Sequence, residues 1–231
     1  MLFIVSTPIG NLADITLRAL QALAEADVIA AEDTRHSGML LQHHGIRKPL
    51  LSFHEHNEAM RTAELLGRLG AGEKVALITD AGTPSISDPG ARLVRACIEE
   101  GLEYTVLPGP CAAITALVGS GLDAATFYFG GFLPVKSGQR QNELAAALAR
   151  DGTSIFYESP HRLLKSLAVL AGLAPERLVC VARELTKKFE EYRRACPGEL
   201  VAHYAAHPPK GEICLLVEGA DAAARRAKAR G

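Results

Sequence analysis

The chain has 231 residues, of which 48% are apolar and 22% charged, and this size and composition suit one large or two small globular domains. A formal net charge of −1 excludes a protein that grips nucleic acid through overall positive charge, so a nucleic-acid partner would need a local basic face. The sequence has no apolar run long enough for a membrane span and no basic segment before the apolar start at residues 2–5. We therefore expect a cytoplasmic protein without a signal peptide or a membrane contact.

Short β-branched runs alternate with longer helical patterns in the first half of the chain. The strands predicted there are residues 2–6, 28–32, 50–53, 75–80 and 104–107. This alternation is typical of βαβ units with a mostly parallel sheet. The sequence therefore predicts an α/β fold.

Apolar stripes at helical spacing predict the buried faces of two helices in this half. One stripe is Leu17, Leu20, Leu23 and Ala24, and the other is Ala91, Val94, Ala96 and Ile98. The second helix is expected to begin with Asp88 as its N-cap, followed by Pro89.

The rhythm changes around residues 119–123, and more strands then follow with fewer helices between them. The later strands are predicted at residues 126–132, 154–157, 178–182, 191–195 and 213–217. We place a domain boundary near residue 122, which gives domains at 1–121 and 122–219 and a basic tail at 220–231.

Charge is divided unevenly across that boundary. Residues 1–120 carry nine Lys and Arg against 14 Asp and Glu, whereas residues 121–231 carry 16 against 12. The sign of the second half suits a polyanion, but Arg225, Arg226, Lys228 and Arg230 of the tail account for its whole surplus. We expect this tail to be a frayed, solvated end.

Glycine and proline gather directly after three predicted strands, in residues 6–11, 79–84 and 108–113. The carboxyl edge of an open α/β sheet is where ligands bind, so we expect these loops to form a crevice in which Gly82 and Gly109 let a small polar molecule approach closely. Neither GxGxxG nor GxxxxGK[ST] is present. Asp80 resembles the nucleophile of Asp-dependent phosphatases, but Gly82 stands where those enzymes have a second Asp.

Several blocks of sequence resemble one family throughout. These blocks are residues 6–12 (STPIGNL), 31–35 (AEDTR), 79–90 (TDAGTPSISDPG), 108–113 (PGPCAA), 156–162 (FYESPHR), 183–188 (RELTKK) and 211–212 (GE). They resemble the bacterial small-subunit ribosomal RNA 2′-O-ribose methyltransferase I family of the tetrapyrrole methylase superfamily. Cys111 departs from the pattern, since many superfamily members have Ser or Thr there.

The resemblance implies a two-domain α/β fold with a mostly parallel N-terminal sheet and a mixed C-terminal sheet. It also implies S-adenosylmethionine bound between the domains, methylation of a cytidine 2′-hydroxyl in the decoding region of 16S rRNA, free or in the 30S subunit, and a homodimer; a DNA substrate is not expected. The cofactor residues that it implies are Pro8, Asp80, Gly82, Thr83, Pro84, Ile86, Cys111, Ala112, Leu133, Tyr157, Glu158 and Glu212.

Methyl transfer to a ribose hydroxyl needs in-line alignment and a nearby base or cation. Three charged clusters after predicted strands offer such groups: residues 32–36, 158–162 and 183–188. We rank Glu184 first as the base, with Lys187 stabilising the developing alkoxide and Asp33 as the second candidate. The RNA contacts are expected from Arg35, His161, Arg162, Arg183 and Lys188.

Structural interpretations stand beside these roles. Residues 32–36 could be an N-capped helix start with a surface ion pair, Ser159–Pro160 could simply begin a helix, and residues 183–188 could form a solvated turn. The histidines have no ligand spacing that indicates a metal site, and the five widely spaced cysteines are expected to be reduced. Phe127, Tyr128, Phe129 and Phe132 are expected to be strand residues rather than a stacking platform for RNA.

Two other functions remain open on the sequence alone. One is methylation of a tetrapyrrole or a protein acceptor by an enzyme of the same superfamily. The other is a noncatalytic ribosome-binding factor that retains the cofactor crevice.

Overall fold

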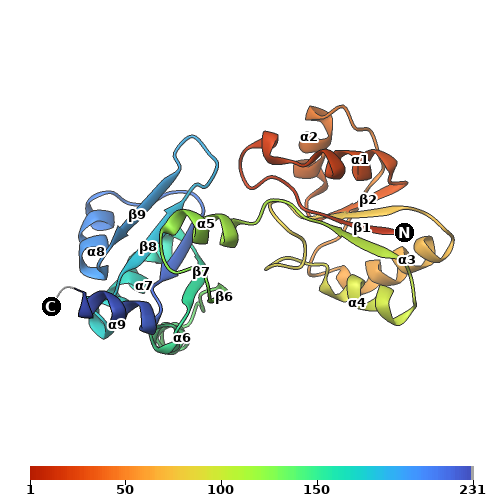
Figure 1. Cartoon of the computed structure of the whole chain (residues 1–231). Coiled ribbons are helices and arrows are strands. Elements are labelled where there is room, and N and C mark those ends of the chain that lie inside the picture. The colour runs from red at the N-terminus through yellow and green to blue at the C-terminus, as the bar shows by residue number, and fades with distance from the viewer. Residues whose placement is uncertain (230–231) are drawn as a thin grey trace. The chain divides into compact units, whose positions relative to one another are not determined.

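The computed structural model describes residues 1–229, which divide into two compact units (Figure 1). The first unit is Met1–Cys111, and the second begins at Ala112. Helix α5 (Ala112–Ser120) belongs by its contacts to the second unit, so the predicted boundary near residue 122 lies at the far end of this helix. The exact domain limits stay a prediction.

The first unit is built on a parallel sheet. Its strands are β1 (Leu2–Val5), β2 (Val28–Ala31), β3 (Leu50–Ser52), β4 (Val75–Ile78) and β5 (Tyr104–Leu107), in the order β3-β2-β4-β1-β5. Every pair is parallel. The predicted α/β class and the five strand positions are confirmed.

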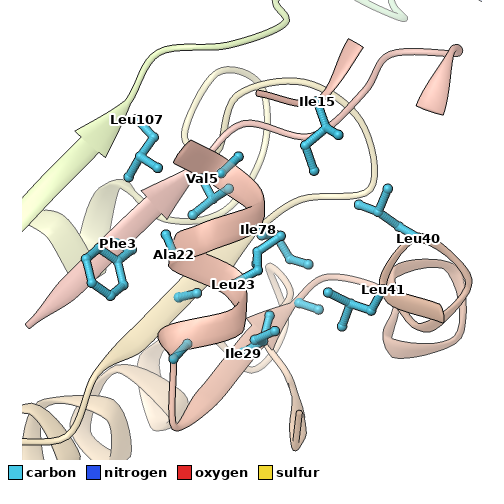
Figure 2. Close-up of a cluster of buried hydrophobic side chains, with 14 residues drawn as sticks. Phe3, Val5, Ile15, Ala22, Leu23, Ile29, Leu40, Leu41, Ile78 and Leu107 are labelled. Carbon is cyan, nitrogen blue, oxygen red and sulfur yellow. The ribbon is translucent and has the colours of Figure 1, made fainter. Parts of the chain in front are cut away.

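Helices cover both faces of this sheet. A 3-10 turn, η1 (Leu12–Asp14), precedes α1 (Leu17–Glu25), and α1 and α2 (Thr34–His43) pack over the face that includes Val5, while α3 (Glu58–Gly70) and α4 (Ala91–Glu99) pack over the face that includes Leu2. Successive strand residues point to opposite faces, which explains why all four residues of β1 are buried. Figure 2 shows Leu23 of α1 and Leu41 of α2 directed toward the strand residues.

The predicted helix stripes are partly wrong. The residues of α1 that are buried are Ala19, Ala22 and Leu23, while Leu17 is 86% exposed at the first turn. In α4 the buried residues are Leu93 and Cys97, and Ile98 is 57% exposed. Each stripe is therefore displaced around its helix from the predicted position.

The start of α4 also differs from the prediction. Its N-cap is Gly90, with a φ of 136°, and not Asp88. The Ser85 N–H donates to the Pro89 carbonyl, 3.2 Å away, and the Gly90 N–H donates to Glu58 Oε1. Residues 85–89 thus close into a turn before the helix begins, which leaves Asp88 outside it.

The second unit contains a mixed sheet. Its strands are β6 (Phe127–Phe132), β7 (Thr153–Glu158), β8 (Val179–Arg183), β9 (Glu191–Ala195) and β10 (Ile213–Val217), in the order β6-β7-β10-β8-β9. Only β6 and β7 pair in parallel. The mixed C-terminal sheet that the resemblance implies is confirmed.

Helices α6 (Ser137–Ala149), α7 (Pro160–Leu173) and α8 (Pro197–Ala206) share the main core of the second unit. Ile213 and Leu215 of β10 enter that core, whereas the Cys214 thiol between them donates to the Ala112 carbonyl of α5. Since neighbouring strand residues point to opposite faces, α5 covers the other side of the sheet. The Tyr192 hydroxyl also donates to the Thr115 carbonyl, which attaches β9 to α5.

The basic tail is not frayed where the structure describes it, so that prediction is wrong for residues 220–229. Helix α9 (Ala220–Lys228) is attached by two ion pairs, Arg226–Glu218 at 2.8 Å and Arg225–Asp123 at 2.7 Å. The Glu218 carboxylate is almost fully buried, and Arg177 donates to its main-chain carbonyl. Arg230 lies outside the described residues. Within residues 1–229, none of the helices has the length and apolar character needed to cross a membrane.

Candidate active-site residues

Three glycine- and proline-containing loops meet at the carboxyl edge of the first sheet. Thr7 and Gly82 exchange two main-chain hydrogen bonds of 2.8 and 3.0 Å. The Thr83 hydroxyl lies 3.0 Å from the Ser6 hydroxyl and donates to the Pro110 carbonyl. The expectation that the loops after β1, β4 and β5 lie side by side is confirmed, and we call this set of loops, with residues 32–33 after β2, the first edge.

The glycines of the first edge serve the packing of the loops themselves. Gly82 has a φ of 87°, a conformation that strains residues with a Cβ. A Cβ on Gly109 would lie 2.8 Å from the Ser6 Cβ, so the β5 loop approaches the β1 loop too closely for any side chain there. We expect both glycines to let a ligand approach closely, and that role stays a prediction.

The first edge offers main-chain groups, the apolar side chain of Ile86 and the carboxylate of Asp80 to a ligand. Ala81, Pro108 and Gly109 are exposed, and Ile86 is 39% exposed. Asp80 is half-buried, and its Oδ1 accepts from the Asp33 N–H at 3.0 Å. This surface suits a molecule that combines ammonium or hydroxyl donors with an apolar part, as S-adenosylmethionine does. Pro8 and Pro84 are buried among the loops.

A second carboxylate of the first edge was missed as a site residue. Burial, and after it the charge of Glu32, raises the pKa of Asp88 to about 6, with a further contribution from Asp80. Glu32 itself accepts from the Thr79 hydroxyl at 2.8 Å. In the sequence Asp88 is marked only as part of an Asp-Pro-Gly turn. That turn signal does not show that the fold brings the carboxylates of Glu32 and Asp80 near it.

Asp33 follows the structural interpretation given for residues 32–36. It is the N-cap of α2, accepting from the Arg35 N–H at 2.8 Å, and it forms an ion pair with the Arg35 guanidinium, whose side chain is 91% exposed. The hydrogen bonds from the Arg35 side chain and N–H lower the pKa of Asp33 to about 2. A carboxylate so stabilised in its charged form is a weak base.

The register of the second sheet brings the other predicted residues to one end. Ile213 pairs with Glu158 on one side and with Arg183 on the other, and Phe132 pairs with Tyr157. The second edge comprises residues 132–133, 157–162, 183–190 and 211–212. The predicted residues of the second unit, apart from Ala112 at the start of α5, therefore lie at this single edge.

Glu158 is a buried acceptor. Its side chain is fully buried and accepts from the Ser159 N–H at 2.8 Å and from the Ser166 hydroxyl, with an ion pair to Arg162 at 2.8 Å. Arg162 also donates to the Leu133 carbonyl at 2.9 Å. This pair joins the end of β7, the first turn of α7 and the turn after β6. Ser159 caps α7 and Pro160 begins it, as the structural interpretation predicted.

Glu184, Lys187 and Glu212 form a second connected group. The Lys187 ammonium donates to Glu184 Oε1 at 2.9 Å and to Glu212 Oε2 at 2.8 Å, and the Glu212 N–H donates to Glu184 Oε1 at 3.1 Å. Burial raises the pKa of Glu184, but the bonds from Lys187 and Glu212 outweigh it and hold the pKa below its usual value. For Lys187, burial is likewise outweighed by the two carboxylates, which raise its pKa.

The remaining residues predicted to contact RNA differ in their exposure and in their partners within the protein. Arg183 lies 3.2 Å from Glu191 and donates to the Lys210 carbonyl, and its side chain is 19% exposed. His161 and Lys188 are exposed. The neighbouring Phe189, which the sequence analysis did not select, is 64% exposed. Within residues 1–229, no group of three or more His, Cys, Asp and Glu side chains is arranged to hold a metal ion.

The chain matches the family model of Tetrapyrrole (Corrin/Porphyrin) Methylases over residues 1–201. Two relatives are both named ribosomal RNA small subunit methyltransferase I. The relative from Escherichia coli O157:H7 is 53% identical, with 94% of this chain and 77% of the relative covered. The relative from a Synechocystis strain is 49% identical, with 95% and 79% covered.

Solved structures share the fold at low identity. A uroporphyrin-III-C-methyltransferase from Thermus thermophilus has a TM-score of 0.67 at 21% identity, covering 98% of this chain and 97% of that one. A diphthine synthase has a TM-score of 0.72 at 13% identity, covering 94% and 89%. Together with the sequence matches, these likenesses show that the chain belongs to the tetrapyrrole methylase family, among the relatives of ribosomal RNA small subunit methyltransferase I.

Proposed function

We propose that this methyltransferase transfers a methyl group from S-adenosylmethionine to the 2′-hydroxyl of a cytidine ribose in 16S rRNA. The observation that carries the proposal is an identity near 50% over about 95% of the chain with relatives named for methylation of small-subunit ribosomal RNA. The two edges support it, because one offers a surface for a small amphipathic molecule and the other gathers charged side chains.

The first edge is the proposed site for the amino-acid part of the cofactor. Asp80 would accept hydrogen bonds, the Gly82–Thr83–Pro84 turn and Ile86 would line the site, and Pro8 would support the turn. Thr83 is already bonded to the Ser6 and Pro110 loops, so its side chain orients the loops while its main chain is left for the ligand. Cys111 and Ala112 are proposed near the sulfonium end.

The second edge carries the other proposed cofactor contacts, made chiefly through the main chain. Leu133 and Tyr157 are joined by a hydrogen bond from the Leu133 N–H to the Tyr157 carbonyl, 3.1 Å long. Arg162, which is paired with Glu158, donates to the Leu133 carbonyl and so helps to fix this pair of residues. Glu212 is exposed and adjoins the same strand ends.

When bound, S-adenosylmethionine supplies the electrophilic methyl group of a sulfonium. The residues then have to align the attacking oxygen and accept its proton, and alignment alone can be worth up to roughly 7–11 kcal/mol in favourable cases. We keep Glu184 as the first candidate base, with Lys187 as the cation beside the developing alkoxide and Asp33 as the second candidate. Both carboxylates have lowered pKa values, so either must lose water contact in the closed complex to become an effective base.

RNA is the proposed ligand of the exposed basic side chains. Lys188, His161 and Arg35 can reach phosphate groups, since each is exposed to solvent, although Arg35 also forms an ion pair with Asp33. Arg162 and Arg183 have partners within the protein, so we propose that they act by fixing strand ends and contact RNA at most with one face of the guanidinium. Such contacts position the RNA without reading its sequence.

We also propose a homodimer that works in the cytoplasm. Apolar side chains of α5 support the dimer, since Val118 is 75% exposed and Ile114 is 44% exposed. A second copy would enlarge the RNA-binding surface of a chain whose net charge is −1. Sedimentation of the purified protein across a concentration series tests this part.

Methyl transfer from radiolabelled S-adenosylmethionine tests the proposed activity. Purified 30S subunits, protein-free 16S rRNA and a total protein fraction would be offered separately, and ribose methylation would be mapped by resistance to alkaline cleavage. We expect one labelled cytidine 2′-oxygen in RNA. Label in a protein, or no label in any acceptor although the cofactor binds, would contradict the proposal.

A further inference from the structure

The loop between β8 and β9, residues 184–190, is an unusual hairpin connection. Glu184 and Thr186 have φ angles of 51° and 64°, a conformation that costs energy in residues other than glycine. The surrounding contacts hold both residues there. The Glu184 N–H donates to the Glu212 carbonyl at 3.0 Å, and the Thr186 N–H donates to the Glu190 carboxylate at 2.6 Å.

The base of this loop is fixed to the body of the second unit. Leu185 is 6% exposed and anchors it from inside. The Glu184 carboxylate fills the space beside Gly211, where a Cβ would lie 2.2 Å from Glu184 Oε1. Main-chain bonds from Lys187 to Glu184 and from Glu190 to Lys187 close the turn. The loop therefore presents its outward side chains from a closed backbone, at a small entropic cost on binding.

Two side chains point outward from this closed loop. Phe189 is 64% exposed, and the Lys188 ammonium lies 5.6 Å from the centre of its ring. Lys187, by contrast, is held by Glu184 and Glu212. Among the described residues, no carboxylate lies within ion-pair distance of Lys188. An aromatic face next to an uncompensated ammonium matches a nucleotide, which has a base to stack and a phosphate to neutralise.

We propose that Phe189 is a base-stacking residue: its ring stacks on an unpaired RNA base next to the target nucleotide while Lys188 contacts the adjoining phosphate. This inference rests on the proposed RNA substrate and adds a contact with the base. If the target nucleotide is turned into the site, its neighbour loses a stacking partner, and an aromatic ring that replaces the lost stacking lowers the cost of turning it. Three aromatic residues of β6 have ring partners already, since Tyr128 contacts Phe156 and Phe129 and Phe132 both contact Tyr157.

Binding of fluorescent RNA by Phe189 variants tests the proposal. The probe is a single-stranded oligoribonucleotide with the sequence of the methylated region, measured by anisotropy beside its duplex form. Phe189→Ala should weaken binding to the single strand at least fivefold, in line with about 1–3 kcal/mol for one base stacked on an aromatic ring. Phe189→Trp should bind within twofold of wild type, and Phe189→Leu should resemble the Ala variant. Leu173→Ala is the matched control. Leu173 is an apolar residue, 44% exposed, at the C-terminal end of α7, whereas the second edge includes the N-terminal end of that helix, and its substitution should leave RNA affinity unchanged.

Further readouts separate stacking from other roles of the ring. The Phe189→Ala variant should keep the wild-type dependence of affinity on salt concentration, because no charge is removed, and should keep its affinity for S-adenosylmethionine. Wild-type affinity in Phe189→Ala, or in Phe189→Leu, would overturn the stacking proposal. A loss of methylation on 30S subunits with unchanged binding to naked RNA would also overturn it, since the ring would then face a protein. If wild type itself neither binds nor methylates RNA, the proposed function fails instead.

Discussion

The two sheet edges solve the problem of holding a ligand in different ways. At the first edge the loops are held by main-chain and hydroxyl bonds, such as those between Thr7 and Gly82 and between Thr83 and Pro110. At the second edge the strand ends are held by charged side chains, notably Glu158 with Arg162 and Lys187 with two carboxylates. At the first edge, main-chain groups are therefore available to a small molecule. Among the charged side chains that the structure describes at the second edge, few are without an ion-pair partner, and Lys188 is one of them.

This contrast teaches that a charged residue near a site is not by its charge alone a ligand contact. Arg162, Arg183 and Lys187 look equivalent to Lys188 in the sequence, yet each has a protein partner within hydrogen-bond distance. The predictions below test whether these charges act on the reaction or only on the structure.

The largest expected effect concerns Glu184. Glu184→Gln should slow single-turnover methylation by about 100-fold, the usual scale for loss of a general base, while cofactor and RNA binding stay near wild type. The Gln side chain can still accept from the Glu212 N–H, so the loop should be preserved. The measurement is the single-turnover rate from about pH 6 to 9, with Asp33→Asn as the matched variant.

Two results would reassign the base. A wild-type rate and pH profile in Glu184→Gln, together with a slow Asp33→Asn, would move the role to Asp33. Wild-type rates in both variants would mean that neither carboxylate accepts the proton, and that Glu184 serves only to hold the loop.

Next in size is the buried pair of the second edge. Glu158→Ala leaves Arg162 without its carboxylate, and breaking a buried ion pair costs about 3 kcal/mol of unfolding free energy. Asp33→Ala removes the partner of an Arg35 side chain that is 91% exposed, so the lost ion pair itself should matter little, and the loss of the N-cap should cost about 1 kcal/mol. Chemical denaturation of the two variants compares them. Equal losses of unfolding free energy in the two variants would show that the buried Glu158–Arg162 pair stabilises the fold no more than the exposed Asp33–Arg35 pair and its N-cap do.

A smaller effect is expected at Gly82. Gly82→Ala should destabilise the protein by about 1 kcal/mol because φ is 87°, whereas Gly67→Ala inside α3, where a Cβ meets nothing within 4 Å, should stabilise it by a similar amount. The bulkier Gly82→Val should in addition weaken cofactor binding at least tenfold, about 1.4 kcal/mol. Thermal unfolding and calorimetry measure the two effects. Unchanged cofactor affinity in folded Gly82→Val would remove this turn from the cofactor site.

The smallest effect concerns the pH dependence at Asp88. Its pKa in the folded protein, about 6, lies above the usual 3.8, so the folded state binds more protons than the unfolded state between these values. The penalty for ionising Asp88 is therefore present at pH 7 and is relieved as the pH falls through 6 toward 4. Asp88→Asn should be slightly more stable than wild type at pH 7, by about 1 kcal/mol after allowance for solvent screening, and not at pH 4. A pH-independent difference would contradict this account.

The fold could be predicted largely from the sequence, because most strands are recognisable from the residues within each strand. The central strands are short apolar runs buried on both faces, such as residues 28–31 and 213–217, and each of these runs carries its own signal. The helix stripes were harder, because in α1 Ala19 and Ala22 face the sheet beside Leu23 while Leu17 is exposed, and α4 starts at Gly90 after a turn closed by contacts from other segments.

The candidate site was predicted in position but less well in detail. The loops after β1, β4 and β5 come together as expected, since parallel strands bring their carboxyl ends to one edge. The contact of Arg162 with the Leu133 carbonyl and those of Arg183 with Glu191 and Lys210 could not be predicted, because these partners lie on other strands or loops whose positions are set by the folded sheet. Phe189 was missed because a single aromatic residue in a polar turn has no signal until its exposure is known.

The central claim is that the cofactor is bound by the first edge and by main-chain groups of the second, whereas RNA is bound through a few free charges of the second edge, with Lys188 first among them. Its most direct test is Lys188→Ala, measured by calorimetry with S-adenosylmethionine and by RNA affinity across a series of salt concentrations. The account predicts unchanged cofactor affinity and a salt slope for single-stranded RNA that is smaller by about 0.7, the value for one phosphate contact. An identical slope in wild type and Lys188→Ala, or a loss of cofactor affinity in the variant, would contradict it.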